Sequence, residues 1–247
     1  MPTPETSSSP FAENQRLDEA AAGYLAEAGQ ADVDFVTYYT RKLQEPWSRG
    51  GSALQLGLGN GVLARQLAPG FGQFTVVEGS SALVEAFLQP PANCALAVAL
   101  FEEFAPSTRF DRIFGNHVLE HVLDPVALLR RTRDWLQPDG RALFTVPNAG
   151  SLHRRIGVEL GLLERPDALN AQDRRLGHRR VYSARNFQAD LEQAGYVVEE
   201  FRGYMLKVVS NAQMKGWSRE LLDASYRVSL TLPPEIGANL LAVCRRR

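Results

Sequence analysis

Three glycines and a glutamate have residue types and a spacing that could bind a ligand. Gly57, Gly59 and Gly61 follow an apolar run, and Glu78 ends the next such run. Glycines let a backbone approach a ligand, and the N-H groups of a following helix then point toward it. A carboxylate after the second strand can accept hydrogen bonds from ribose hydroxyls. Because Val62 stands where the dinucleotide motif G-x-G-x-x-G has its third glycine, the pattern favours a different adenosine ligand.

Four further residues are candidates for catalysis. His117 and Asn148 each follow an apolar run that reads as a strand, Tyr182 introduces a helix, and Ser210 lies in a polar insert. His and Tyr can accept a proton, and Asn offers both a donor and an acceptor. Two structural readings stay open: Asn148 could cap a helix at residues 151–154, and Tyr182 could be an ordinary core residue.

The order His117, Glu120, His121 spells H-x-x-E-H, which in zinc peptidases places two imidazoles on one helix face. The sequence offers no third ligand at a recognisable spacing. We therefore expect no metal, with Glu120 and His121 as structural hydrogen-bonding residues.

The hydrophobic pattern predicts an α/β fold with a doubly wound sheet of about seven strands. Short apolar runs predict strands at residues 53–56, 74–78, 94–100, 111–116, 142–146, 197–201 and 240–244. Periodic stretches predict helices at residues 16–27, 32–44, 62–68, 81–88, 125–136 and after Ser183. A turn is predicted at Asp139 and Gly140.

The expected organisation is a leader followed by one domain. Residues 1–12 are rich in Pro, Ser and Thr and predict disorder, whereas residues 13–247 predict a single domain. Three segments of that domain are expected to act as lids or caps: residues 13–47 as a helical N-terminal lid, and residues 148–182 and 204–231 as inserts.

With these residues the chain resembles the class I S-adenosylmethionine-dependent methyltransferases, in particular a small-molecule branch. The likeness covers about residues 50–200 and continues through the strings FDRIFGNHVLEHVLDP, WLQPDG and LFTVPN. It implies a Rossmann-like fold with S-adenosylmethionine as cofactor. The implied contacts are Gly57, Gly59 and Gly61 to the methionine part, Glu78 to the ribose, Leu100 with Phe101 to the adenine, and Asn116 with His117 at the methyl side.

The chain departs from the family pattern at two positions. Gln55 stands where the family usually has an acid near the amino group of the cofactor. Leu100 stands where the family often has an aspartate that accepts from adenine, which leaves backbone atoms or Glu102 for that contact. In the expected lid, Tyr38 and Tyr39 could grip the sulfonium cation by their ring faces.

Three functions agree with these residues. The first is methyl transfer to a small molecule, expected to be a secondary metabolite, with His117 or Tyr182 accepting the proton. The second is cyclisation of S-adenosylmethionine itself to azetidine-2-carboxylate and methylthioadenosine, because the neutral Gln55 would leave the amine of the cofactor unprotonated more readily than an acid. The third is a protein that binds the cofactor without catalysis.

The composition restricts the partners. The 27 basic and 28 acidic residues give a net charge of -1, which argues against nucleic acid. No apolar run reaches the roughly 20 residues of a membrane span, the start lacks a signal-peptide pattern, and the two cysteines stand far apart, so we expect a cytoplasmic protein. Its oligomeric state is not indicated.

Overall fold

The computed structural model describes most of the chain. The described residues are 16, 17, 21, 31–214 and 216–247. The expected leader at residues 1–12 and most of the expected helix at 16–27 lie outside them, although Arg16, Leu17 and Ala21 are helical.

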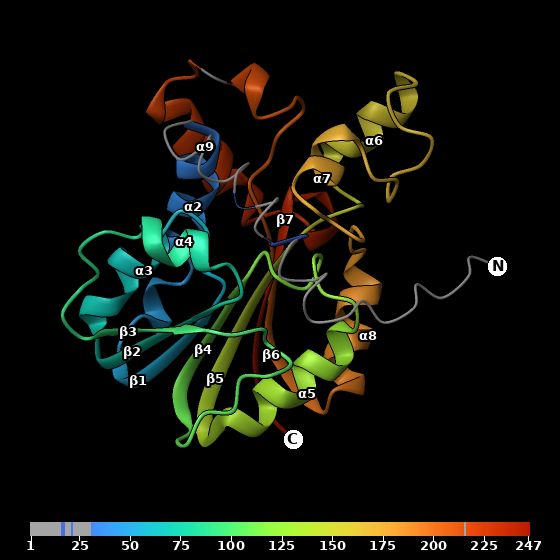
Figure 1. Cartoon of the computed structure of the whole chain (residues 1–247). Coiled ribbons are helices and arrows are strands. Elements are labelled where there is room, and N and C mark those ends of the chain that lie inside the picture. Colours follow the sequence, from blue (N-terminus) through green and yellow to red (C-terminus); the bar gives the residue numbers. More distant parts are fainter. Residues whose placement is uncertain (1–15, 18–20, 22–30, 215) are drawn as a thin grey trace.

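A seven-stranded sheet forms the centre of the fold (Figure 1). Its order is β3-β2-β1-β4-β5-β7-β6, and β7 runs antiparallel to both neighbours while the other pairs are parallel. The strands are β1 (Gly50–Leu56), β2 (Phe71–Glu78), β3 (Cys94–Val98), β4 (Phe110–Asn116), β5 (Leu136–Pro147), β6 (Tyr196–Tyr204) and β7 (Asn239–Arg246). The predicted α/β sheet of about seven strands is confirmed. Its order reverses between β1 and β4, where open α/β sheets bind ligands.

Helices cover the sheet and extend above its carboxyl edge (Figure 1). They are α2 (Ala31–Leu43), α3 (Val62–Leu67), α4 (Ser81–Ala86), α5 (Pro125–Trp135), α6 (Leu152–Glu159), α7 (Ala171–Arg175), α8 (Ala184–Gln193) and α9 (Arg219–Ser229). Asp124 caps α5 by accepting from Ala127 N at 2.9 Å. Ser183 caps α8 as predicted, and Gly195 follows that helix with a φ of +86°. None of these helices could cross a membrane, by length and apolar character, within the described part of the chain.

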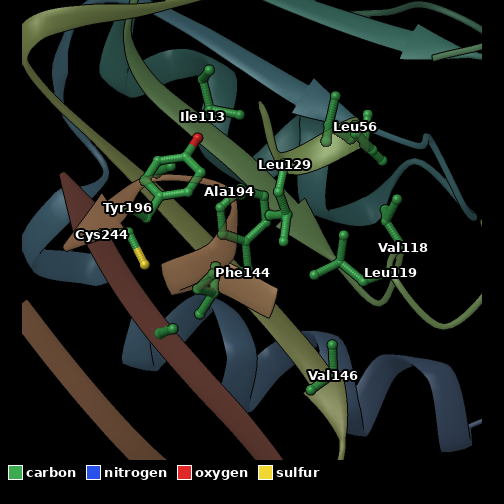
Figure 2. Close-up of a cluster of buried hydrophobic side chains, with 14 of the residues drawn as sticks. Leu56, Ile113, Val118, Leu119, Leu129, Phe144, Val146, Ala194, Tyr196 and Cys244 are labelled. Atoms are coloured by element: carbon green, nitrogen blue, oxygen red, sulfur yellow. The ribbon is translucent and has the colours of Figure 1, made fainter. Parts of the chain in front are cut away.

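Alternating residues of the central strands fill two cores, one on each face of the sheet. Ile113 and Phe144 enter the core beneath α5 and α8, and Figure 2 shows this cluster. Their neighbours Phe114 and Leu143 enter the opposite core with residues of α2, α3 and α9. Burial on both faces explains why the strands read as continuous apolar runs.

Two of the differences from the sequence-based expectations concern β5 and α9. The predicted turn at Asp139 and Gly140 lies inside β5, because that strand starts at Leu136 and shifts its register on β4 near Phe110. The helix α9 was not predicted within the long C-terminal insert. Its start is capped by Ser218, which accepts from Leu221 N at 3.3 Å.

Candidate active site

A cavity of about 690 Å³ lies at the carboxyl edge of the parallel strands. Its size is within the range of small-molecule sites, about 300 to 1,000 Å³. The lining comes from the strand ends, from α2, from the segment that contains α6 and α7, and from residues 205–211. Nine predicted site residues line it: Gln55, Gly57, Gly59, Glu78, Phe101, Asn116, His117, Asn148 and Ser210.

The loop that carries Gly57, Gly59 and Gly61, here called the glycine loop, is held by a hydrogen bond to Glu78. The carboxylate is almost fully buried and accepts hydrogen bonds from Leu58 N and Ser80 N, both at 2.8 Å. Gly57 and Gly59 have φ angles of +74° and +56°, and a side chain at position 59 would project into open space. These glycines give the loop a left-handed backbone that a ligand can approach closely.

Gly61 and Leu100 are not among the residues that line the cavity, so their contact with the cofactor stays a prediction. Gly61 has a φ of +75°, and a Cβ on it would lie 2.3 Å from the ring of Phe87. Packing of that ring therefore requires the third glycine. Leu100 is buried beside Gly79, so only its neighbour Phe101 reaches the cavity.

Two buried polar atoms near the loop suit the amino-acid part of the expected cofactor. Gln55 donates from Nε2 to Gly57 O at 2.7 Å, while its Oε1 has no hydrogen-bond partner among the described residues. Asn60 accepts from Val62 N with Oδ1, and its Nδ2 has no partner within the same part of the chain. An acceptor for an ammonium and a donor for a carboxylate thus both line the cavity. The residues fit S-adenosylmethionine.

His117 adopts a strained backbone at the end of β4. Its φ is +54°, a left-handed conformation that costs a non-glycine residue about 1 kcal/mol or more and is concentrated at functional sites. Its Nδ1 lies 3.2 Å from Oε1 of Glu120, and its Nε2 is buried without a partner among the described residues. Nδ1 therefore contacts the carboxylate of Glu120, and Nε2 is left to accept a proton or to bind a ligand. Met205, with a φ of +63°, also lines the cavity.

Beneath His117 lies a group of buried ionisable side chains. Burial alone would raise the pKa of Glu120, but its hydrogen bond to His117 and the nearby imidazoles outweigh burial and lower that pKa. Burial lowers the pKa of His121 to about 4, against the opposing charge of Glu120. The group therefore holds a carboxylate and a neutral imidazole at neutral pH.

The wall formed by α6 and α7 contains an ion-pair network. Arg154 Nη1 lies 3.2 Å from Asp173 Oδ2, and His178 Nδ1 lies 3.2 Å from Asp173 Oδ1. Burial raises the pKa of Asp173, but hydrogen bonds from His178 and from the backbone of Asn170 bring it down to about 2. His153, beside this network, has its pKa lowered to about 3 by burial and by two cations, Lys207 and Arg154.

The face of helix α2 that lines the cavity is not the face that carries Tyr38 and Tyr39, which the sequence had assigned to the cofactor. Tyr39 is fully buried against Tyr226 of α9, with ring centroids 4.9 Å apart, and its hydroxyl donates to Asp223 at 2.9 Å. Tyr38 carries the guanidinium of Arg219 over its ring at 3.5 Å. Neither tyrosine lines the cavity, because the helix turns both toward α9. Their contact with the cofactor therefore stays a prediction that this geometry does not support.

The face of α2 that lines the cavity carries Phe35, Val36, Thr37 and Thr40. Polar contacts fasten this helix to the sheet. Gln44 Nε2 donates to Asn116 Oδ1 at 2.6 Å, and the hydroxyls of Thr40 and Tyr204 lie 2.8 Å apart. Val36 and Thr40 are four residues apart and so share one face of the helix, which could have predicted this face from the sequence.

Two of the four catalytic candidates have structural roles. Tyr182 does not line the cavity, and its buried hydroxyl donates to Asp190 at 2.9 Å. Asn148 lines the cavity, but its amide donates to Glu235 O and Gly237 O while its oxygen accepts from Gly150 N. These hydrogen bonds give both side chains a structural role, and their catalytic roles stay predictions. Their backbones also meet, because Ala149 N donates to Tyr182 O at 2.7 Å.

Ser210 lies at the cavity but is exposed, and its hydroxyl donates to Gln213 Oε1 at 2.9 Å. Sequence reasoning missed several lining residues, which are Leu58, Asn60, Leu63, Leu83, His153, Arg154, Asp173, His178, Met205 and Lys207. The first four lie in or just after the glycine loop and β2, so their positions in the sequence could have predicted that they line the cavity. The others reach the cavity only through tertiary structure.

Solved structures with this fold include several methyltransferases. The N-methyltransferase NodS of Bradyrhizobium japonicum WM9, bound to S-adenosylhomocysteine, has 17% identity and a TM-score of 0.60 over 93% of this chain and 99% of that one. The DhpI complex with SAM and HEP has 18% identity and a TM-score of 0.59 over 97% and 100% of the chains. The glycopeptide N-methyltransferase MtfA, bound to sinefungin, has 18% identity and a TM-score of 0.56 over 85% and 86%.

No curated protein matches the sequence significantly. A sequence model of the methyltransferase domain matches residues 32–200, which covers β1 to β5, the glycine loop, Glu78 and His117. The chain belongs to the methyltransferase domain family, and it is a methyltransferase with S-adenosylmethionine as its cofactor.

Proposed function

We propose that the enzyme methylates a small molecule, a metabolite of a specialised biosynthetic route, at an oxygen or nitrogen atom. One observation carries the proposal: the cofactor loop and the acceptor-side residues line a single cavity of about 690 Å³. Residues of α2, of α6 and α7, and of the segment 205–211 line the same cavity as His117. The names of two structural neighbours agree, since MtfA is a glycopeptide N-methyltransferase and DhpI was solved with HEP.

In this proposal the cofactor supplies an electrophilic methyl group, and the protein contributes alignment and a proton acceptor. Gln55, Asn60 and Glu78 hold the methionine and ribose parts. His117 Nε2 accepts the proton of the nucleophile, while Glu120 holds the opposite ring nitrogen at 3.2 Å and stabilises the resulting imidazolium. The aliphatic and aromatic residues of α2 exclude water from the reacting atoms.

The test supplies S-adenosylmethionine labelled in its methyl group, first alone and then with panels of small amines, phenols and carboxylic acids. We expect S-adenosylhomocysteine and a labelled acceptor only when an acceptor is present. Methylthioadenosine formed without any acceptor would instead indicate cyclisation of the cofactor. Cofactor binding without any product across the panels would contradict methyl transfer to these small-molecule classes.

A further inference from the structure

Near His117 the structure brings together three side chains of metal-ligand type, and the proposed methyl transfer uses only one of them, Glu120, through the oxygen that contacts His117. One donor atom from each of Glu120, His121 and His178 lies within 4.8 Å of the other two. We propose that these three residues bind one divalent transition-metal ion, whose remaining coordination positions face the acceptor side of the cavity. Metal binding itself does not depend on the proposed function, whereas its use in acceptor binding rests on it.

The carboxylate of Glu120 has an oxygen suited to a metal. Its side chain is fully buried, and Oε1 lies 3.2 Å from Nδ1 of His117. The second oxygen, Oε2, is buried and has no hydrogen-bond partner among the described residues. A buried, unpaired carboxylate oxygen is costly, because nothing replaces the water it loses on folding. A bound cation would satisfy it.

The two imidazoles are held beside that carboxylate. His121 and His178 both line the cavity, and their rings lie 4.7 Å apart in a nearly perpendicular arrangement. Imidazole nitrogens with one carboxylate form the ligand set of Zn²⁺ and of Fe²⁺ sites that keep positions open for a substrate. Imidazole also disfavours Mg²⁺ and Ca²⁺, which prefer oxygen ligands.

Backbone hydrogen bonds bring His178 to the other two residues. The backbone of Arg179 donates to Glu120 O at 2.8 Å, and its side chain donates to His121 O at 2.9 Å. Arg180 reaches the same turn through Leu119 O at 2.8 Å. Hydrogen bonds therefore hold residues 178–180, which follow α7, against residues 119–121, which follow β4. This arrangement supplies the third ligand whose absence led us to expect no metal at H-x-x-E-H.

A further carboxylate supports the site from outside. Asp173 Oδ1 lies 3.2 Å from His178 Nδ1, and Arg154 and the backbone of Asn170 hold the other oxygen of Asp173. Metal-binding histidines commonly have a carboxylate on the ring nitrogen that does not bind the metal, and this contact orients the ring. Asp173 and Glu120 also oppose the positive charge of the arginines around the cluster.

An ion at this position would serve the acceptor. A hydroxyl or carboxylate oxygen of the acceptor could occupy an open coordination position next to His117, which would fix its orientation and favour its deprotonated form. The proposed acceptors with an oxygen nucleophile would gain most from such a site.

The test measures metal binding without turnover. Untagged protein is freed of metal with a chelator and titrated with Zn²⁺ by calorimetry and with Co²⁺ by visible absorption. We expect one ion per chain. His178→Gln and Glu120→Gln should abolish this binding, while Asp173→Asn should weaken it by about 10 to 100-fold.

His153→Gln is the matched control, because His153 lines the same cavity outside the cluster, and it should bind one ion like the wild type. Thermal unfolding checks that each variant is folded. The proposal fails if the wild type binds no ion stoichiometrically, or if folded His178→Gln binds as tightly as the wild type. Either failure leaves the labelled-methyl test of the proposed function unaffected.

Discussion

Nδ1 of His117 lies 3.2 Å from Oε1 of the fully buried Glu120, so the imidazole after β4 is oriented from below while Nε2 remains unpaired among the described residues. The backbone of His117 is left-handed, with a φ of +54°. Positioned acids and bases are held in this way, and the strain is compensated by contacts elsewhere in the fold.

Replacing His117 by asparagine tests this role. Asparagine tolerates the left-handed conformation, so His117→Asn should keep the fold and the cofactor affinity. Loss of the proton acceptor should lower kcat by about 10² to 10⁴-fold with an acceptor that must lose a proton. Steady-state kinetics, calorimetry with S-adenosylhomocysteine and thermal unfolding measure the three quantities. Wild-type kcat in the folded variant would show that another group accepts the proton.

Tyr182 provides the contrasting case. Its hydroxyl donates to Asp190 at 2.9 Å outside the cavity, so Tyr182→Phe should lower the free energy of unfolding by about 1 to 2 kcal/mol. Both kcat and KM should stay at wild-type values. Denaturant unfolding and kinetics check the two parts. If activity fell while stability did not, the hydroxyl would have a role in the reaction.

His153 should make the stability of the protein depend on pH. Its pKa is lowered to about 3 from the ordinary 6.5 by burial and by Lys207 and Arg154, with Asp173 opposing. Since the unfolded chain then binds more protons between these values, His153 stabilises the fold above pH 6.5, and this contribution is lost as pH falls toward 3. One such group changes the free energy of unfolding by up to about 1.4 kcal/mol per pH unit.

Urea unfolding of the wild type and of His153→Gln at pH 7.5, 6 and 5 measures this contribution. We expect the variant to lose less stability than the wild type over this range. Parallel curves would show that His153 titrates normally in the folded protein.

The sequence predicted the parts of the protein that depend on local patterns. The buried strands were visible as apolar runs, and Gly57, Gly59 and Glu78 were visible because a loop and a strand end are neighbours in the chain. The helix α9 was not predicted because most of its residues are polar, so the apolar periodicity of its one buried face, which carries Tyr226, is weak in the sequence.

Side-chain direction and long-range pairing could not be predicted in the same way. Tyr38 and Tyr39 were assigned to the cofactor by residue type, whereas in the structure both pack against residues of α9 and neither lines the cavity. Asn148 offered a donor and an acceptor, but backbone atoms of residues far along the chain occupy both. His178 joined the cluster near Glu120 only through the backbone bond that Arg179 makes.

Glu78 is the residue on which the proposed binding of S-adenosylmethionine most depends. Glu78 is buried at the cavity, and its carboxylate also fastens the loop through Leu58 N and Ser80 N. Glu78→Ala removes the proposed acceptor for the ribose hydroxyls, and each hydrogen bond to a charged group contributes roughly 1.5 to 3 kcal/mol. The matched control is Glu85→Ala, because Glu85 is an exposed glutamate of the neighbouring helix α4.

Calorimetric titration with S-adenosylmethionine at constant pH and salt compares the wild type with both variants, each checked for folding by circular dichroism. We predict that the wild type and Glu85→Ala bind with the same affinity, and that folded Glu78→Ala binds at least about tenfold more weakly. Equal affinity for folded Glu78→Ala and the wild type would contradict the placement of the cofactor in this cavity.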